Sequence, residues 1–136
     1  MNYWLIKTEP GTYSWEDLKR DKKTYWDGVR NYQARNNMKD MNEGDLALYY
    51  HSVNEKTVVG VAKIVKEHYQ DPTTDDDRWV AVDVVPELEL KRPVHLSEIK
   101  ADSRLENMVL VRNSRLSVQP VRKEEYDLIL AISENA

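Results

Sequence analysis

One short segment of the chain combines four residue types that together can recognise a nucleic-acid base. It contains Trp26, Gly28, Arg30 and Asn31 within six positions. An indole offers a stacking face, a glycine lets a ligand approach the backbone, an arginine can pair with phosphate, and an asparagine amide can hydrogen-bond a base edge. The segment therefore indicates a base-recognition site centred on Trp26.

Three further clusters could contribute to such a site, although each also has an ordinary structural explanation. Tyr49-Tyr50-His51-Ser52 ends an expected strand, where functional residues often collect, but a single histidine there is commonly a satisfied structural residue. Lys7-Thr8-Glu9 can equally be an exposed turn with an ion pair. Arg115-Leu116-Ser117-Val118 has the pattern of an edge strand. The other tryptophans are expected in the core: Trp4, Trp15 and Trp79.

Several chemistries are excluded by what the sequence lacks. It contains no cysteine, which excludes disulfides, thiolate metal ligands and a cysteine nucleophile. It has no Walker loop, no Rossmann glycine pattern and no nucleophile elbow. His51, His68 and His95 are spaced too widely for a metal-ligand motif. We therefore expect a binding protein without catalytic residues, metal or cofactor.

The chain is acidic overall, and its charge is unevenly distributed. With 24 acidic and 20 basic residues the net charge is −4, which argues against coating of phosphate backbones by bulk electrostatics. Four aspartates form one acidic stretch, and four basic residues share a later stretch with no acid between them. These are Asp71, Asp75, Asp76 and Asp77, and Arg112, Arg115, Arg122 and Lys123. In one interpretation the acidic and the basic stretch are both solvated surface. In the other, the basic stretch is a local face that contacts phosphates.

The length and uniformity of the chain predict one domain over residues 1–136. This length suffices for a hydrophobic core, and no linker, repeat or low-complexity tract divides it. No apolar stretch approaches the length that crosses a bilayer, and no leader-like apolar run precedes the first expected strand. We expect a cytoplasmic protein that does not bind membranes.

Local patterns predict an α+β fold with a curled, mixed sheet. Alternating apolar residues and branched or aromatic runs predict strands over 3–7, 46–50, 58–69, 79–85, 88–94 and 116–121. Ser14 followed by Asp17 predicts a helix start, because the hydroxyl accepts from free N–H groups and the acid is favoured in the first turn. Further helices are expected over 31–41 and 123–132, with short helical turns at 97–99 and 103–108.

The clusters, in this order, resemble the EVE domain family of the PUA-like superfold. The resemblance spans nearly the whole chain, and the eleven-residue block that begins at Trp26 is very specific. Thr8 stands where serine is usual, so a hydroxyl is kept there. The matching segments are 3–10, 26–36, 49–52, 59–62 and 115–118.

The resemblance implies a PUA-like mixed β-barrel with flanking helices and a pocket for a flipped, modified base. EVE domains are related to YTH domains, which bind methylated adenine in an aromatic cage, and EVE relatives are associated with modified cytosines in DNA. By this resemblance Trp26 stacks on the base, while Tyr50 and His51 form the wall of the pocket. The other implied base-binding residues are Thr8, Val29, Asn31, Ser52 and Ser117, and the implied phosphate-binding or pocket-shaping residues are Lys7, Arg30, Arg35 and Arg115.

The same resemblance implies which partners the chain has. The first is DNA or RNA that carries a modified cytosine or a methylated base, bound without catalysis by a monomer. Prokaryotic EVE relatives are often associated with restriction-like defence systems, which implies a nuclease or defence protein as a second partner.

An enzymatic alternative rests on Lys7, Thr8 and Glu9. ASCH-related amidohydrolases of the same superfold act on acetylated cytidine with a Lys, Thr and Glu set. Neighbours in an extended segment point to opposite faces, so these three side chains converge only if the chain bends sharply. A third alternative, a protein-interaction module, predicts a large exposed apolar patch, and the sequence shows no obvious one.

Overall fold

The computed structural model describes residues 1–135, and its centre is a six-stranded mixed sheet. The strand order is β2-β5-β4-β3-β1-β6, in which β1 and β3 are parallel and the other neighbours are antiparallel. The strands are β1 (Tyr3–Thr8), β2 (Thr24–Trp26), β3 (Leu46–His51), β4 (Thr57–Gln70), β5 (Val80–His95) and β6 (Val118–Val121).

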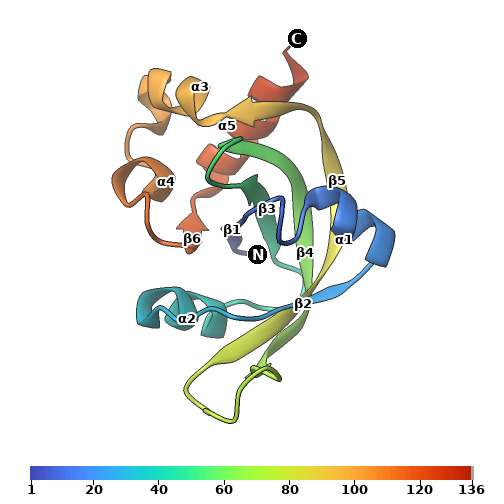
Figure 1. Cartoon of the computed structure of the whole chain (residues 1–136). Helices are drawn as coiled ribbons and strands as arrows, with labels where there is room; N and C mark the ends of the chain where they lie inside the picture. The colour runs from blue at the N-terminus through green and yellow to red at the C-terminus, as the bar shows by residue number, and fades with distance from the viewer. Residues whose placement is uncertain (136) are drawn as a thin grey trace.

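Helices flank this sheet on both faces (Figure 1). The α1 helix begins with the predicted capping box, in which Ser14 and Asp17 each accept from the other's backbone N–H. None of the helices in residues 1–135 is both long and apolar enough to cross a bilayer. The helices are α1 (Trp15–Asp21), α2 (Tyr32–Lys39), α3 (Leu96–Ala101), the short 3-10 helix η1 (Ser103–Leu105), α4 (Val109–Arg112) and α5 (Lys123–Glu134).

The two longest strands, β4 and β5, give the sheet its curl. They pair from end to end, and four register irregularities interrupt the pairing. Such bulges bend a strand and increase its twist, so the ribbon wraps round the rest of the molecule (Figure 1). The two strands expected over 79–85 and 88–94 are therefore one continuous strand, and the short strand β2 was not predicted.

The sheet is an α+β arrangement that stays open at its edges, so the expected closed barrel is not confirmed. Within residues 1–135, no pairing joins the edge strands β2 and β6. Helix α2 lies against β4, β5 and β6 and occupies the opening. The amide of Asn37 donates to the carbonyl of Val118 at 2.7 Å, and Arg35 donates to the carbonyl of Arg78 at 3.2 Å. Side chains of α2 thus bond to β6 on one side and to the loop before β5 on the other.

Alternation along β1 and β3 creates one core on each face of the sheet. Trp4 and Ile6 face the aromatic core, whereas Leu5 faces the aliphatic core. The aromatic core lies against α1 and α2 and contains Trp4, Ile6, Trp15, Leu18, Trp26, Val29, Ala34, Met38, Tyr49, Ile64 and Val82. The aliphatic core lies against α3, α4 and α5 and contains Leu5, Leu48, Tyr50, Val58, Leu90, Val94, Ile99, Leu105, Leu110 and Ile129.

Candidate functional site

A cavity of about 450 Å³ opens at the end of β1, on the face that carries the aromatic core. Three chain segments line it: the exit of β1, the run from β2 to the loop before α2, and the residue before β6. Its volume is within the range of ligand pockets, about 300–1,000 Å³. We call it the indole pocket, and its lining is Lys7, Thr8, Thr12, Tyr13, Thr24, Tyr25, Trp26, Asp27, Gly28, Val29, Arg30 and Ser117.

Trp26 is both a wall of this pocket and a member of the aromatic core. Its side chain is only 9% exposed, and its ring meets the ring of Tyr49 edge-on at 5.5 Å between centroids. Tyr49 in turn packs edge-on against Trp15 at 5.3 Å. Burial raises the pKa of the Tyr49 hydroxyl, so it stays neutral. This aromatic row fixes the indole from behind.

The Thr8 hydroxyl is oriented so that its oxygen can accept a hydrogen bond in the pocket. It donates its proton to the Tyr13 carbonyl at 2.9 Å, which leaves lone pairs available. The backbone N–H of Lys7 donates to the carbonyl of Ser117 at 3.0 Å and holds Ser117 beside the exit of β1. Two hydroxyls therefore border the pocket opposite the β2 segment.

Asp71 organises the loop that follows Trp26. The Oδ2 atom of this buried carboxylate accepts from the Gly28 N–H at 2.8 Å and from Arg30 at 3.0 Å. Gly28 has a φ of +75°, a left-handed conformation that favours glycine. Burial by itself raises the pKa of Asp71, but hydrogen bonds from Thr73, Gly28 and Arg30 outweigh it and lower the pKa to about 2. The interpretation of Asp71 as part of a solvated acidic stretch is wrong, because it is the buried anchor of the pocket loop.

Arg30 lines the pocket through contacts that also fix its position. Besides the ion pair with Asp71, its guanidinium lies over the ring of Trp79 at 5.6 Å. The same side chain joins the pocket loop to the turn after β4, and its predicted role in binding phosphate or shaping the pocket stays a prediction.

The structure does not bring Tyr50 or His51 into the indole pocket. Tyr50 pairs in register with Lys7 and belongs to the aliphatic core on the opposite face of the sheet. His51 is on the pocket's face, but its Nε2 accepts from the Trp15 N–H at 3.0 Å and its Nδ1 contacts Glu55 at 2.9 Å. One ring nitrogen thus holds the start of α1 and the other faces the turn after β3, while the ring that packs against Trp26 is that of Tyr49.

Asn31, Arg35, Ser52 and Arg115 also lie outside the pocket lining. Asn31 is the N-cap of α2, and its side chain accepts from the Ala34 N–H at 2.9 Å. Arg35 lies over the ring of exposed Tyr32 at 5.0 Å. Ser52 donates its backbone N–H to the carbonyl of Thr8. Their predicted contacts with base or phosphate stay predictions.

The basic stretch from Arg112 to Lys123 is less uniform in space than in sequence. Arg122 pairs with Glu125 at 3.3 Å, and Lys123 pairs with Asp127 at 2.6 Å, both through the first turns of α5. The side chain of Arg115 forms no hydrogen bond or ion pair with residues 1–135 and lies two positions before Ser117. Arg112 donates to the Oδ1 atom of Asn107 at 3.2 Å, so among these four basic side chains Arg115 is the one without a partner in residues 1–135, and its predicted contact with phosphate stays a prediction.

The side chains of the enzymatic alternative do not converge. The Lys7 ammonium donates to the Ser114 carbonyl at 2.6 Å, while Thr8 donates to Tyr13 and Glu9 is exposed outside the lining. Among residues 1–135, no group of three or more His, Asp or Glu side chains is placed to hold a metal ion. The pocket therefore offers stacking surface and hydrogen bonds, and it does not assemble the Lys-Thr-Glu set.

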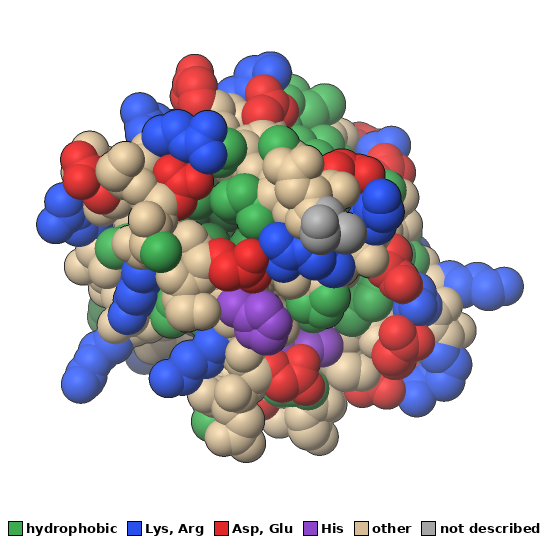
Figure 2. Space-filling model, turned by 90° about the horizontal axis from the view of Figure 1, so that it is seen from above, with side chains coloured by type: hydrophobic (Ala, Val, Ile, Leu, Met, Phe, Trp, Pro, Cys, Tyr) green, Lys and Arg blue, Asp and Glu red, His purple; other side chains and the backbone are tan. Residues whose placement is uncertain are grey.

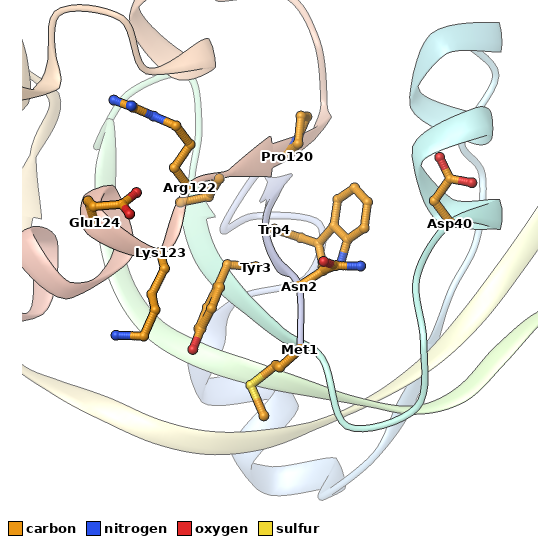
Figure 3. Close-up of a pocket in the computed structure, with 10 residues that line it drawn as sticks. Met1, Asn2, Tyr3, Trp4, Asp40, Pro120, Arg122, Lys123 and Glu124 are labelled. Carbon is orange, nitrogen blue, oxygen red and sulfur yellow. The ribbon is translucent and has the colours of Figure 1, made fainter.

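A larger hollow, about 830 Å³, lies at the opposite end of β1 (Figure 3). Asp40 and Glu124 carry negative charge on its rim, Arg122 and Lys123 carry positive charge, and Trp4 is the buried aromatic. The indole N–H of Trp4 is already used by Asp45 at 3.0 Å. Mixed charge and a satisfied indole make this hollow a weaker candidate than the indole pocket.

Relatives of this chain match it over nearly its whole length. Human thymocyte nuclear protein 1 (THYN1) is 38% identical over 98% of this chain and 74% of that protein. Among solved structures, a protein from Agrobacterium tumefaciens superposes with a TM-score of 0.95 at 43% identity, covering 98% of this chain and 93% of that one. The human THYN1 protein, crystallised in complex with DNA that contains 5-methylcytosine, superposes with a TM-score of 0.91 at 38% identity and 98% coverage of both chains.

Two further comparisons concern the fold and the family of the chain. A mutant ASCH protein from Zymomonas mobilis superposes with a TM-score of 0.60 at 12% identity, which shows a shared fold alone. The family model of the EVE domain matches residues 2–132. With this match, and with relatives of about 40% identity over nearly its full length, the chain belongs to the EVE domain family.

Proposed function

We propose that this chain is a non-catalytic reader that binds a modified base, 5-methylcytosine in the first instance, in the indole pocket. One observation carries the proposal: a loop anchored by Asp71 and a buried indole form a base-sized cavity in a chain that is 38% identical to THYN1, which was crystallised with 5-methylcytosine-containing DNA.

The polarity of the pocket suits a cytosine edge. Thr8 has already donated its proton and can accept from the exocyclic amino group of cytosine, which is a donor. The indole N–H of Trp26 has no hydrogen-bond partner in residues 1–135, whereas those of Trp4 and Trp15 are bonded to Asp45 and Glu89. It can donate to an acceptor on the base. An acceptor and a donor that line the same pocket favour a base edge that carries both a donor and an acceptor.

Energetics limit how the modification can be selected. One methyl group gains roughly 0.8 kcal/mol on entering an apolar site, about fourfold in affinity. Stacking supplies about 1–3 kcal/mol per base, so most of the affinity comes from the ring and little from the methyl group. Extracting a base from a duplex costs a few kcal/mol, which favours single-stranded or destabilised substrates.

The test is a binding titration with oligonucleotides that differ at one cytosine. Single-stranded and duplex oligonucleotides with 5-methylcytosine or cytosine are compared by fluorescence anisotropy, alongside a Ser117→Ala variant in the lining and an Asn54→Ala control outside it. We expect tighter binding of the methylated strand and a loss of that preference in Ser117→Ala. Equal affinity for both strands rules out the reader, and consumption of acetylated cytidine on incubation identifies an amidohydrolase instead.

The finer features of the proposal concern assembly and location. We infer that the chain is a monomer and that it acts in the cytoplasm of a prokaryote. Its protein partner is a nuclease or a defence protein. The nucleic acid that it binds is DNA or RNA. Light scattering of the purified chain tests the monomer, and an RNA strand with the same modified base tests the choice of nucleic acid.

A further inference from the structure

A second cavity, of about 410 Å³, lies on the other face of the sheet, directly across β1 from the indole pocket. It is enclosed by the ends of β1 and β3, the turn after β3, and the helices α3 and α4. Three ammonium groups and three hydroxyl groups line it, over an apolar floor. We call it the lysine cavity after Lys7, Lys56 and Lys100, and its hydroxyls belong to Tyr50, Ser52 and Ser114.

The positive charge of this cavity is not neutralised from within. No carboxylate lines it, and none of its three lysines forms an ion pair with residues 1–135. Lys7 donates to a neutral carbonyl, and its burial lowers the pKa of its ammonium. Glu55 lines the adjoining hollow, and its carboxylate contacts His51 at 2.9 Å. On a chain with net charge −4, such a concentration of lysines favours an anion.

An unpaired hydroxyl is also available to a ligand in this cavity. The residue Tyr50 is 3% exposed, it lines the cavity, and its hydroxyl makes no hydrogen bond with residues 1–135. Its oxygen is not among the fully buried unpaired polar atoms of the described residues, so the phenol reaches the open space of the cavity and can donate to an acceptor there. The hydroxyls of Ser52 and Ser114 likewise have no side-chain partner in the described residues.

The turn that closes the cavity is held in a strained conformation. Val53 has a φ of +73° and Lys56 has a φ of +53°. For a branched residue such as valine this left-handed conformation is disfavoured, and strain of this kind, about 1–3 kcal/mol per residue, collects at functional sites. The turn holds the Lys56 ammonium and the exposed Val53 side chain at the cavity mouth.

The lysine cavity is joined to the indole pocket by the backbone. Lys7 lines both cavities, and the Ser52 N–H donates to the Thr8 carbonyl at 2.8 Å. Figure 2 views the end of the molecule that carries α3, where Lys and Arg side chains are interspersed with Asp and Glu side chains around the histidines. Because Lys7 lines both cavities, a strand whose base enters the indole pocket comes within reach of the lysine cavity.

We propose that the lysine cavity binds a phosphate group, supplied by the backbone of the strand whose base occupies the indole pocket. This inference rests on the proposed function and adds a phosphate site to it. A backbone phosphodiester presents two charged non-bridging oxygens, each with several lone pairs, and the three ammonium groups and up to three hydroxyl donors can satisfy them together. The cavity then sets the path of the strand and leaves the choice of base to the indole pocket.

The test removes two lysines that do not border the indole pocket. A Lys56→Gln/Lys100→Gln variant is compared with a Lys39→Gln/Lys91→Gln variant, which loses the same charge from exposed sites outside both cavities. Oligonucleotide affinity is measured from 50 to about 300 mM salt. With a slope of about 0.7 per single-strand phosphate contact, loss of this one contact lowers the slope by about 0.7 and the affinity roughly fourfold near physiological salt.

Each outcome bears on one part of the inference. The expected result is a reduced slope in the cavity variant alone, with binding of the free modified nucleoside unchanged. Equal slopes in both variants overturn the strand assignment. Backbone amide shifts of Ser52 and Lys100 on titration with inorganic phosphate then show whether free phosphate binds instead, and absence of both effects overturns the phosphate site. If the wild-type chain binds no oligonucleotide at all, the reader proposal has failed, and the inorganic-phosphate titration still decides on the cavity.

Discussion

A Cβ atom built on Gly60 would lie 2.6 Å from two ring carbons of Trp15, closer than real Cβ atoms approach. Gly60 on β4 thus provides the space for the Trp15 ring, which is 3% exposed and donates its indole N–H to Glu89. Trp15 packs on Tyr49, and Tyr49 packs on Trp26. A missing side chain on one strand therefore determines where the wall of the indole pocket stands.

Gly60→Ala is expected to lower the free energy of unfolding by about 1–3 kcal/mol, because the added methyl group overpacks the site. Urea denaturation measures the change. Gly11→Ala is the matched control, since a Cβ there meets nothing within 4 Å. The double variant Trp15→Leu/Gly60→Ala replaces the indole with a smaller side chain, so adding the Gly60→Ala change to Trp15→Leu should cost less stability than adding it to the wild type. If the two changes destabilise the protein additively, the packing explanation is contradicted.

Asp71→Asn is expected to loosen the pocket loop. Asparagine has one acceptor oxygen where the carboxylate has two, so its N–H₂ group must face either Gly28 and Arg30 or Thr73, which all donate to Asp71 in the wild type. Leaving a buried donor unbonded costs about 1–3 kcal/mol. Hydrogen exchange of the Gly28 amide should accelerate and affinity for the modified strand should fall, whereas Asp75→Asn, an exposed change in the same loop, should alter neither. Unchanged exchange at Gly28 would show that the loop is held elsewhere.

The same variant makes a prediction about acid stability. The folded-state pKa of Asp71 is lowered to about 2 from an ordinary value near 3.8, so its stabilisation is present above pH 4 and is lost as pH falls toward 2. A difference of this size corresponds to about 2 kcal/mol. The stability gap between wild type and Asp71→Asn should therefore narrow between pH 5 and pH 2, as followed by urea melts at each pH. A gap that is constant over this range would place the pKa of Asp71 near its ordinary value.

Trp26→Ala should reduce both stability and binding, because the ring belongs to the core as well as to the pocket. A side chain that is 9% exposed and packed on Tyr49 belongs to the core, and such Trp→Ala changes cost about 3–5 kcal/mol. Trp26→Phe keeps a ring and isolates the pocket role. We expect it to fold and to bind the modified strand at least about tenfold more weakly, since it loses stacking area worth 1.4 kcal/mol or more and the indole N–H. Wild-type affinity in Trp26→Phe would remove Trp26 from the recognition site.

Two substitutions of Asn31 can distinguish its role as a helix cap from a role in reading the base. Its side chain accepts from the Ala34 N–H, so Asn31→Ala should cost about 1 kcal/mol of stability, while Asn31→Ser keeps the cap. Affinity for the modified strand should stay within about twofold in Asn31→Ser. A clear loss of affinity at unchanged stability would restore the amide as a base-reading group.

Much of the fold and part of the site follow from local patterns. The Ser14 cap, the helix after Asn31 and the strand over 3–7 depend on short-range hydrogen bonds and side-chain period, which the sequence contains directly. The segment from Trp26 to Arg30 was identified for the same reason, since its residue types and its glycine are adjacent in the chain. Period-two alternation alone could also have excluded a shared wall of Tyr50 and His51, because neighbours on β3 face opposite ways.

Only the tertiary structure decided which distant residues meet. Asp71 reads as one of several surface aspartates, and its burial beneath Gly28 depends on how the β4–β5 ribbon curls, which is set by bulges whose positions no local pattern marks. The open edge filled by α2, and the lysine cavity formed from β1, the turn after β3 and α3, depend in the same way on strand order and register. The sequence by itself determined the helices, most of the strands and the chemistry at the centre of the site. Long-range strand pairing determined which residues surround that centre. This pairing cannot be read from local patterns, because it follows from the packing free energy of the whole chain.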